Sequence, residues 1–451
     1  MAAGLGKRMH SALPKVLHPL AGRPLVAHVL AAARALSPRA LAVVVGHGGE
    51  AVAQALAAPD LTFVTQDPPR GTGDAVRIAL AALPADGVTL VVNGDCPLLP
   101  AATLAAVAEV AAAGRLALLT ARVPDPAGLG RIVRAANGAV RAIVEDKDAS
   151  PAEAAIDEIY TGVLAAPTVL LQAWVAALRD DNAQREFYLT DVVAIAVAAG
   201  VPVVAHLAAR EEDVRGVNDR GQLAAIERIV QRRQADALLG AGTWIADPAR
   251  FDLRGTLACG RDVRIDVGCV LEGDVRLGDD VSVGAHCVLK SVTVGAGTTI
   301  APFSHLEAAS VGANCRIGPY ARLRPDTALA DEVHIGNFVE VKASALGRGA
   351  KANHLAYIGD AVVGSGVNYG AGSITANYDG ANKHQTVIGD GASIGSNCVL
   401  VAPVTVGKGA TIGAGSVIAR AAAPEVLTVA RARQIAVPGW KRPVKVKKPG
   451  P

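Results

Sequence analysis

Residues 388–418 read IGDGASIGSNCVLVAPVTVGKGATIGAGSVI, and an aliphatic residue returns at every sixth position. These positions are Ile388, Ile394, Leu400, Val406, Ile412 and Ile418. A period of six matches neither the turn of an α-helix (about 3.6 residues) nor the alternation of a strand. It is typical of a parallel β-helix, in which each hexad forms one flat face and three faces close a coil. One coil cannot bury its own apolar edge, so the repeat predicts a stacked rod that folds as a unit.

The same period starts earlier, at Ile265, and occasional steps of five residues occur, as from Leu289 to Val294. Coils of 17 or 18 residues follow, and roughly nine of them fit between Ile265 and Ile418. The longest break, 376–387, must leave the coil as a loop. The fifth hexad position is small, which predicts packing rather than metal or disulfide roles for the cysteines found there: Cys269, Cys287, Cys315 and Cys398.

Composition narrows the class of protein. With 451 residues, two or three domains are expected, and a net charge of +3 gives no argument for nucleic acid. We expect no membrane insertion and no signal peptide, since neither a long uncharged apolar run nor a basic segment followed by an apolar one is present. A cytoplasmic protein is expected. The basic cluster Lys441–Lys448 is either a solvated tail or a weak attraction for a phosphorylated ligand.

The first half of the chain alternates short apolar runs with Ala-rich helical stretches, which predicts an α/β domain around a mostly parallel, Rossmann-like sheet. A single helix over Leu223–Leu239 is expected to link it to the rod. The predicted domains are 1–220, a linker helix at 221–241, and a β-helix with a C-terminal tail at 242–451. The other predicted elements are strands at Leu41–Val45, Leu61–Thr65, Thr89–Val92 and Leu116–Thr120, and helices at Leu25–Leu36 and Thr103–Ala113.

The chain opens with Ala2-Ala3-Gly4, and Arg8 and Lys15 follow closely. Small residues let backbone N–H groups approach a phosphate, and the two cations supply charge. The loop is neither a dinucleotide fingerprint nor a P-loop. Asn93-Gly94-Asp95 follows a predicted strand, where ligand sites of α/β sheets gather, so Mg²⁺ ligation by Asp95 is the favoured interpretation over a structural role.

The rod carries a polar cluster where a β-helix needs little polarity. Arg324 and Lys342 are 18 residues apart, so they fall on the same face of adjacent coils, and His354 lies two faces further on. Tyr357 and Asn368 belong to the same region. A histidine is most often a surface or packing residue, but the neighbouring cations favour a functional role for His354.

These features resemble the sugar-nucleotide pyrophosphorylase family, in particular those members whose hexad rod also acetylates glucosamine 1-phosphate. The resemblance spans residue 1 to about residue 443. The motifs that carry it are AAGLGKRM (2–9), LPKVLH (13–18), GTG (71–73), REFYLTD (185–191), FDLRGTL (251–257), GNFVEVK (336–342) and ITANYDGANK (374–383). The fold that it implies is an α/β nucleotidyltransferase domain followed by a left-handed parallel β-helix of hexapeptide repeats.

For the first domain the resemblance implies attack of N-acetylglucosamine 1-phosphate on the α-phosphate of UTP, with release of pyrophosphate. Asp95 and Asn218 would hold Mg²⁺, and Lys15 would contact the nucleotide phosphates. The uridine nucleotide would lie against Ala2, Ala3, Gly4, Gln66, Gly71 and Thr72. The sugar would lie near Gly130, Glu145 and Thr161, with Asn93, Gly94 and Tyr160 also at the site.

For the rod the resemblance implies acetyl transfer from acetyl-CoA to glucosamine 1-phosphate, with His354 as general base. Arg324 and Lys342 would bind the phosphate, and Tyr357 and Asn368 would orient the sugar. The coenzyme A groove would be lined by Ala371, Asn377, Tyr378, Ser396, Ala414 and Arg431. Related hexad acyltransferases are trimers with sites between neighbouring rods, so a homotrimer is expected.

The sequence departs from the family pattern in three places. The phosphate loop begins at Met1 rather than after an apolar strand, which should be central in the sheet. Tyr160 replaces an Asn that touches the sugar, and Asn93 stands where an aromatic residue is common. Two alternatives therefore stay open. One is a single-activity pyrophosphorylase with a non-catalytic rod, and the other is a binding subunit whose first domain has lost activity.

Overall fold

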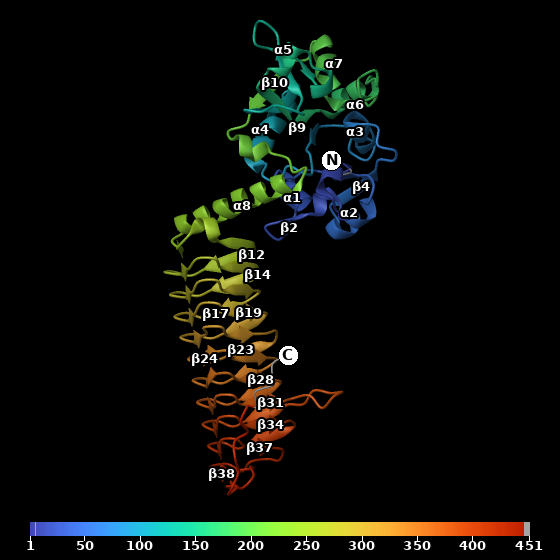
Figure 1. The fold of residues 1–451 in the computed structure, drawn as a ribbon. Helices are drawn as coiled ribbons and strands as arrows, with labels where there is room; N and C mark the ends of the chain where they lie inside the picture. Colours follow the sequence, from blue (N-terminus) through green and yellow to red (C-terminus); the bar gives the residue numbers. More distant parts are fainter. Residues whose placement is uncertain (5, 446–451) are drawn as a thin grey trace. The chain divides into compact units, whose positions relative to one another are not determined.

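The computed structural model describes residues 1–4 and 6–445, so the end of the basic cluster, 446–448, lies outside the described residues. Contacts divide the chain into two compact units, Met1–Gln234 and Ala235–Pro451. The division falls inside the long helix α8 (Arg220–Gly240), which overlaps the predicted linker helix at 221–241 except for its last residue. We refer to the two units as the head and the rod (Figure 1).

The head is an α/β unit in which helices cover the faces of its sheets (Figure 1). Its other helices are α1 (Leu25–Arg34), α2 (Gly49–Leu56), α3 (Thr72–Leu80), α4 (Ala101–Ala112), α5 (Pro151–Ala154), α6 (Thr168–Ala176) and α7 (Val192–Ala198). Its strands are β1 (Pro19–Leu20), β2 (Arg23–Pro24), β3 (Leu41–Val45), β4 (Leu61–Thr65), β5 (Val88–Val91), β6 (Leu116–Arg122), β7 (Arg131–Arg134), β8 (Val140–Val144), β9 (Glu158–Pro167) and β10 (Val203–Leu207).

The head sheets are mixed rather than mostly parallel, so this part of the prediction was wrong. β3 pairs with β4 and β6 with β10 in parallel, as the βαβ alternation implies. The long strand β9, however, runs antiparallel to β5, β6 and β7. β7 and β8 are joined by a short connection that allows antiparallel pairing, whereas parallel pairing needs a crossover.

The rod consists of stacked coils, and most coils contribute one strand to an 11-stranded sheet and two to a 17-stranded sheet (Figure 1). The first sheet contains β11 (Trp244–Ile245), β13 (Arg264–Ile265), β15 (Ser282–Val283), β18 (Thr299–Ile300), β21 (Arg316–Ile317), β24 (His334–Asn337), β27 (Lys351–His354), β30 (Asn368–Tyr369), β33 (Ser393–Ile394), β36 (Thr411–Ile412) and β38 (Leu427–Thr428).

The second sheet contains β12 (Asp252–Cys259), β14 (Val270–Leu277), β16 (Val288–Lys290), β17 (Thr293–Val294), β19 (His305–Glu307), β20 (Ala309–Val311), β22 (Arg322–Leu323), β23 (Thr327–Leu329), β25 (Glu340–Lys342), β26 (Ala345–Leu346), β28 (Tyr357–Gly359), β29 (Ala361–Val363), β31 (Ile374–Ala376), β32 (Thr386–Ile388), β34 (Val399–Val401), β35 (Val404–Val406) and β37 (Val417–Ile418). All pairings in both sheets are parallel between adjacent coils, which confirms the β-helix.

The hexad positions form the core of the rod. Ile265, Leu289 and Leu400 are fully buried, and most strand pairs shift by 17 or 18 residues per coil, as the repeat predicts. The shift is 25 residues where the 376–387 loop leaves the coil. Four cysteines occupy the predicted inward positions, and each thiol donates to a carbonyl oxygen of a neighbouring coil. Burial raises the pKa of Cys269 to about 11, as expected for a packing residue. Within the described residues, no helix is long and apolar enough to cross a membrane.

Candidate active sites

Three polar side chains from distant parts of the head meet at the end of β5. The Lys15 ammonium contacts a carboxylate oxygen of Asp95 and donates a hydrogen bond to Asn218 Oδ1 at 3.1 Å. Lys15 begins a short 3-10 helix, Asp95 follows β5, and Asn218 precedes α8. The backbone N–H of Val217 donates to Asp95 O at 2.9 Å, which fixes the Asn218 segment beside this strand end. The predicted grouping of Lys15, Asp95 and Asn218 is therefore present.

The first residues of the chain lie beside the same strand end. Ala2 pairs with Val45 at the end of β3, and the Met1 carbonyl accepts from Gly94 N at 2.8 Å. Gly94 is required there, because a Cβ would lie 2.9 Å from Met1 O. Gly4 is exposed and has open space beside its Cα, and Arg8 is exposed on the next turn. The Ala2 N–H is paired with Val44 O, so within this loop it is the exposed Gly4 that lets backbone approach a ligand at this edge.

A second turn is built around Gln66 at the end of β4. The buried Gln66 side chain donates to Gly71 O and to Asp74 Oδ2, both at 3.0 Å. Gly71 has a φ of +101°, and a Cβ there would lie 2.7 Å from Phe187 O. Thr72 Oγ1 accepts from Leu189 N at 3.1 Å, so the 185–191 motif packs directly on this turn. The motif therefore supports the turn.

The predicted sugar residues lie around β9 and β8. Tyr160 N donates to Gly130 O at 2.8 Å, and Thr190 Oγ1 donates to Glu145 Oε1 at 3.0 Å. Burial, reinforced by nearby aspartates, raises the pKa of Glu145. The buried hydroxyl of Tyr160 has no hydrogen-bond partner in the described chain, and its pKa is raised by burial and then by the Glu145 charge. An orphaned buried hydroxyl is costly, so the Tyr160 hydroxyl can take up a polar partner.

Two residues that were predicted to lie at the sugar site make contacts within the head itself. The Thr161 hydroxyl is buried and donates to Leu119 O at 2.8 Å. Asn93 packs against Gly162, where a Cβ would lie 2.0 Å from Asn93 Nδ2. Gly162 has a φ of +85°, so this close approach depends on glycine.

The rod brings Arg324 and Lys342 onto neighbouring coils, as the 18-residue spacing predicts. Arg324 Nη1 donates to Glu340 Oε1 at 2.8 Å, and Lys342 Nζ lies 3.6 Å from Asp360 Oδ2. A third cation, Lys383, contacts the Lys342 side chain, and this contact lowers the pKa of Lys383. Two adjacent ammonium groups repel each other and favour an anion between them. The cluster therefore suits a phosphate.

Lys383 was missed as a site residue because it lies in the loop that leaves the coil. The loop is folded back by Asp379, whose carboxylate accepts from Ala381 N at 2.8 Å and Asn382 N at 2.7 Å. His384 Nε2 lies 2.7 Å from the other Asp379 oxygen. Tyr378 and Lys383 form an antiparallel bridge, which returns Lys383 toward the rod. The sequence did contain evidence for Lys383, because the ITANYDGANK motif ends at this lysine.

His354 ends β27 and is exposed, and its ring is held by one hydrogen bond. His354 Nδ1 lies 3.1 Å from Asn337 Oδ1, on the preceding coil. An amide oxygen only accepts, so this contact favours the tautomer that carries its proton on Nδ1 and has Nε2 as an acceptor. A general base needs such an acceptor nitrogen.

Tyr357 and Asn377 extend the cation cluster, whereas Asn368 lies elsewhere. The Asn377 side-chain amide donates to Asp360 Oδ2, and its nitrogen lies 3.4 Å from the Tyr357 hydroxyl oxygen. Asp360 is also the carboxylate beside Lys342, so Asn377 adjoins the group of cations within one chain. Asn368 belongs to β30 of the 11-stranded sheet, whereas Tyr357 belongs to β28 of the 17-stranded sheet. A single chain thus places Asn368 on a different sheet from Tyr357.

The remaining predicted groove residues form a column over successive coils. Asn397 N donates to Ala371 O, Gly415 N donates to Ser396 O, and Arg431 Nη1 donates to Ala414 O at 2.7 Å. The neighbouring glycines leave this strip shallow, since a Cβ on Gly395 would lie 2.5 Å from Ala414 N. Tyr378 stands in the loop with 61% of its surface exposed. The strip is a shallow surface with a cation, Arg431, at one end.

Comparisons with known proteins show the family of the chain. Residues 1–188 match the MobA-like NTP transferase domain, residues 253–342 match the GMPPB C-terminal domain, and residues 385–420 match the bacterial transferase hexapeptide repeats. The bifunctional protein GlmU of Methylibium petroleiphilum is 59% identical over 99% of this chain and 98% of its own length. The chain belongs to the GlmU family. Bifunctional GlmU proteins of Nitrosospira multiformis and Ralstonia nicotianae are each 57% identical, over 100% and 99% of this chain and 98% of their own lengths.

The GlmU family membership confirms the predicted class of enzyme. The chain is a bifunctional transferase of UDP-N-acetylglucosamine synthesis, with a nucleotidyltransferase domain and a hexapeptide β-helix. The alternative of a non-catalytic rod is therefore set aside, and so is that of a binding subunit. The roles of individual residues are argued below.

Proposed function

We propose that the head joins UTP and N-acetylglucosamine 1-phosphate at the Lys15–Asp95–Asn218 group. A phosphate oxygen of the sugar 1-phosphate attacks the α-phosphorus of UTP, and the bond to the β-phosphate breaks to release pyrophosphate. The reaction needs positioning and charge neutralisation rather than covalent help from the protein. Lys15 and Arg8 supply positive charge, and the Ala2–Gly4 loop, Gln66, Gly71 and Thr72 hold the nucleotide.

The head residues fit Mg²⁺. Asp95 supplies a carboxylate and Asn218 an amide oxygen, both already turned toward one cation, the Lys15 ammonium. Mg²⁺ is commonly held by one or two carboxylates together with substrate phosphates. When bound, the ion neutralises phosphate charge in the transition state. Glu145, Gly130 and the orphaned Tyr160 hydroxyl then face the sugar, so Tyr160 takes over a polar contact in place of the usual Asn.

The rod is proposed to acetylate glucosamine 1-phosphate before uridyl transfer. His354 Nε2 accepts a proton as the substrate amine attacks the acetyl-CoA thioester carbonyl, an amide bond forms, and coenzyme A leaves as a thiol. Such a base contributes about 10²–10⁴-fold in rate. Arg324, Lys342 and Lys383 bind the phosphate, and Tyr357 and Asn377 hold the sugar end of the site. The Ala371–Ser396–Ala414 strip and Arg431 line the coenzyme A groove.

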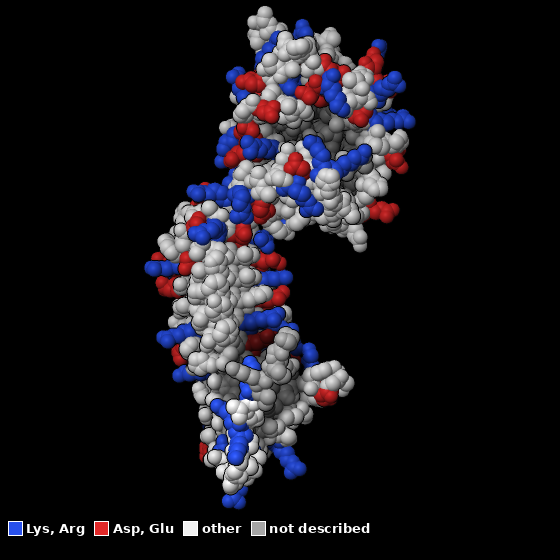
Figure 2. Space-filling view, viewed as in Figure 1, with Lys and Arg blue, Asp and Glu red and all other residues white. Residues whose placement is uncertain are grey.

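A homotrimer in the cytoplasm completes the proposal. An exposed stack of rings runs along one corner of the rod, formed by His286, Phe303, Tyr320 and Phe338, with centroids 5.0–5.3 Å apart. Figure 2 also shows an uncharged band along the rod between charged side chains. Exposed apolar surface of this kind favours association of rods. A neighbouring rod would also bring an Asn368 to the site, which one chain does not do. Sedimentation equilibrium should give three times the 45.7 kDa chain mass.

Two assays on one preparation test the assignment of reactions to sites. His354→Ala should abolish acetyl transfer and leave uridyl transfer nearly unchanged, whereas Asp95→Ala should do the reverse. Normal acetyl transfer by His354→Ala would refute the proposed rod mechanism. Loss of both reactions in either variant, with unchanged far-UV circular dichroism, would refute the separation of the two sites.

A further inference from the structure

The buried side chain of Gln66 is held in one orientation by two acceptors. Its Nε2 donates to Gly71 O and to Asp74 Oδ2, both at 3.0 Å. A carbonyl oxygen and an ionised carboxylate accept hydrogen bonds and cannot donate them. Turning the amide over would set its oxygen against both acceptors, so only one orientation satisfies this network. Among the described residues Gln66 Oε1 has no hydrogen-bond partner, so this oxygen is left to accept from a ligand.

Asp74 supplies the charged acceptor of this network from the first turn of α3. Only 5% of its surface is exposed. Burial opposes its charge, but hydrogen bonds from Gln66 and Arg77 outweigh burial, and the pKa of Asp74 is lowered. An acid in the first turn of a helix often only balances the helix dipole. The carboxylate of Asp74 also points inward and binds the Gln66 amide, so it has a second role.

The free oxygen of Gln66 suits the base of a nucleotide. Gln66 N donates to Val45 O at 2.8 Å, and Ala2 pairs with Val45, so the residue lies beside the start of the Ala2–Gly4 loop. Phosphate oxygens are acceptors and would be repelled by Oε1. A ribose hydroxyl can donate or accept, so it fits either orientation of an amide. A ring nitrogen is either a donor or an acceptor, so only for the base does a fixed amide matter.

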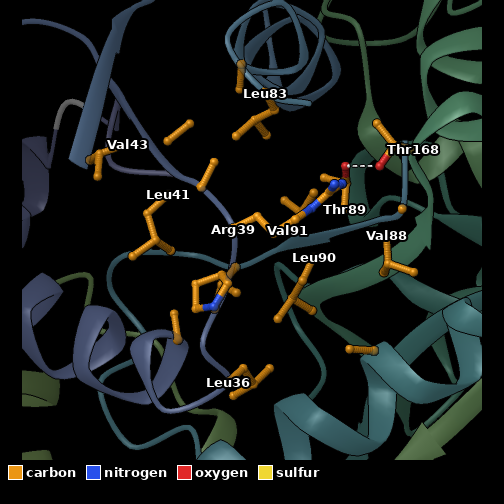
Figure 3. A pocket seen from close by; sticks show the side chains of 18 of the residues that line it. Leu36, Arg39, Leu41, Val43, Leu83, Val88, Thr89, Leu90, Val91 and Thr168 are labelled. Carbon is orange, nitrogen blue, oxygen red and sulfur yellow. Dashed lines mark hydrogen bonds between the residues drawn. The ribbon is translucent and has the colours of Figure 1, made fainter. Parts of the chain in front are cut away.

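The large cavity of the head offers no comparable group to a base. It has a volume of about 730 Å³, and the side chains labelled in Figure 3 are mostly apolar, among them Leu41 and Leu90. The hydroxyls of Thr89 and Thr168 lie 2.9 Å apart and hydrogen-bond to each other. Gln66 is not part of this lining. The fixed amide of Gln66 is therefore the better candidate for recognition of the base.

We propose that Asp74 is a positioning residue for base selectivity, because it holds the Gln66 amide with Oε1 free to accept the N3–H of uracil. The inference rests on the proposed function, in which Gln66 contacts the uridine nucleotide. Cytosine carries a lone pair at N3, which the same oxygen repels. With the amide turned over, Nε2 would donate to that lone pair, so the orientation of one amide decides between the two pyrimidines. Asp74 acts through Gln66 and does not touch the nucleotide.

The test is a double-mutant cycle of Gln66→Ala and Asp74→Ala in the full chain. The kcat/KM for UTP and for CTP is measured with N-acetylglucosamine 1-phosphate from the release of pyrophosphate, and the readout is the UTP-to-CTP ratio. Asp74→Asn keeps the size of the side chain but can donate as well as accept, so it frees the amide without leaving a cavity. Glu50→Ala is the matched control, since Glu50 is the acid in the first turn of α2. Fluorescence of the buried Trp174 confirms that the head is folded in each variant.

Asp74→Ala should lower the UTP-to-CTP ratio by about tenfold or more, because Gln66 can then turn over, and Asp74→Asn should lower it severalfold. The double variant should have the same ratio as Gln66→Ala alone, and Glu50→Ala should leave the ratio unchanged.

Three results would overturn the role of Asp74 and leave the nucleotide contact of Gln66 in place. They are an unchanged ratio in both Asp74 variants, an equal loss in Glu50→Ala, and losses that multiply in the double variant. An unchanged ratio in Gln66→Ala with a raised KM for UTP would place the amide on the ribose and would also overturn the inference alone. If KM for UTP is unchanged as well, the contact between Gln66 and the nucleotide in the proposed function fails too.

Discussion

Asn337 Oδ1 lies 3.1 Å from His354 Nδ1, and the two residues occupy the same register position on adjacent coils. The coil register thus places an amide oxygen against Nδ1 of the histidine ring. Asn337→Ala should lower kcat for acetyl transfer by about ten- to a hundredfold and leave KM for both substrates nearly unchanged. Asn337→Asp should shift the acid limb of the pH–rate profile to higher pH, because an adjacent carboxylate stabilises protonated imidazole. A profile that is identical in all three proteins would show that Asn337 has only a structural role.

Lys383 should contribute phosphate affinity to the rod site. Lys383→Ala removes one of the two adjacent ammonium groups, so we expect KM for glucosamine 1-phosphate to rise by about tenfold or more. Uridyl transfer should not change. Lys290→Ala is the matched control, since Lys290 is a rod lysine paired with Glu272 and Glu307 on other coils. If the two variants have the same KM, Lys383 does not bind the phosphate.

The sequence predicted the rod far better than the sites along it. The hexad period fixes the coil length, so the placement of Arg324 and Lys342 on neighbouring coils could be predicted by counting. Lys383 could not be placed in this way, because it lies in a loop outside the coil. The conformation of that loop depends on hydrogen bonds within the loop, such as those that Asp379 accepts, and not on the coil period. The position of Asn368 shows a further limit of prediction from one sequence. If the rods associate, Asn368 reaches the site of a neighbouring chain, and the coil period of a single chain says nothing about that contact.

In the head, local pattern gave the strands but not their directions. The segments around Leu41 and Leu61 formed strands where predicted, since apolar runs between helices have few alternatives. β9 runs antiparallel to its neighbours, where a parallel strand was expected. Its composition does not distinguish an antiparallel strand from a buried parallel one. Asp95 and Asn218 are 123 positions apart, and only the fold shows that one ammonium reaches both.

Lys15 competes with a metal ion for the same two oxygens. In the absence of nucleotide, Lys15→Ala should tighten Mn²⁺ binding by roughly tenfold, because the ammonium no longer occupies Asp95 and Asn218. The same change should lower kcat for uridyl transfer, because the phosphates lose a cation. Electron paramagnetic resonance of free Mn²⁺ measures the first effect. Arg34→Ala, which removes an exposed cation paired with Asp60, should leave both unchanged. Weaker Mn²⁺ binding by Lys15→Ala would contradict the competition.

Asp191 should make the stability of the head depend on pH. Burial, and then the charge of Glu145, raise the pKa of Asp191 to about 6. The folded head therefore holds this proton more tightly than the unfolded chain, whose aspartate has a pKa of about 3.9. The folded state gains stability at low pH and loses it as the pH rises through the window between these values.

Asp191→Asn removes the charge, so the variant should be more stable than the natural chain at pH 7, by about 2–6 °C in the unfolding midpoint. The difference should shrink toward zero near pH 4, where the natural carboxyl is protonated in the folded head. Fluorescence of the buried Trp174 reports unfolding of the head, since Trp244 and Trp440 are exposed. Asp125→Asn, at an exposed loop aspartate, is the control and should show no pH-dependent gain. A constant gain from pH 4 to pH 7 would mean that the substitution acts through packing rather than through the proton.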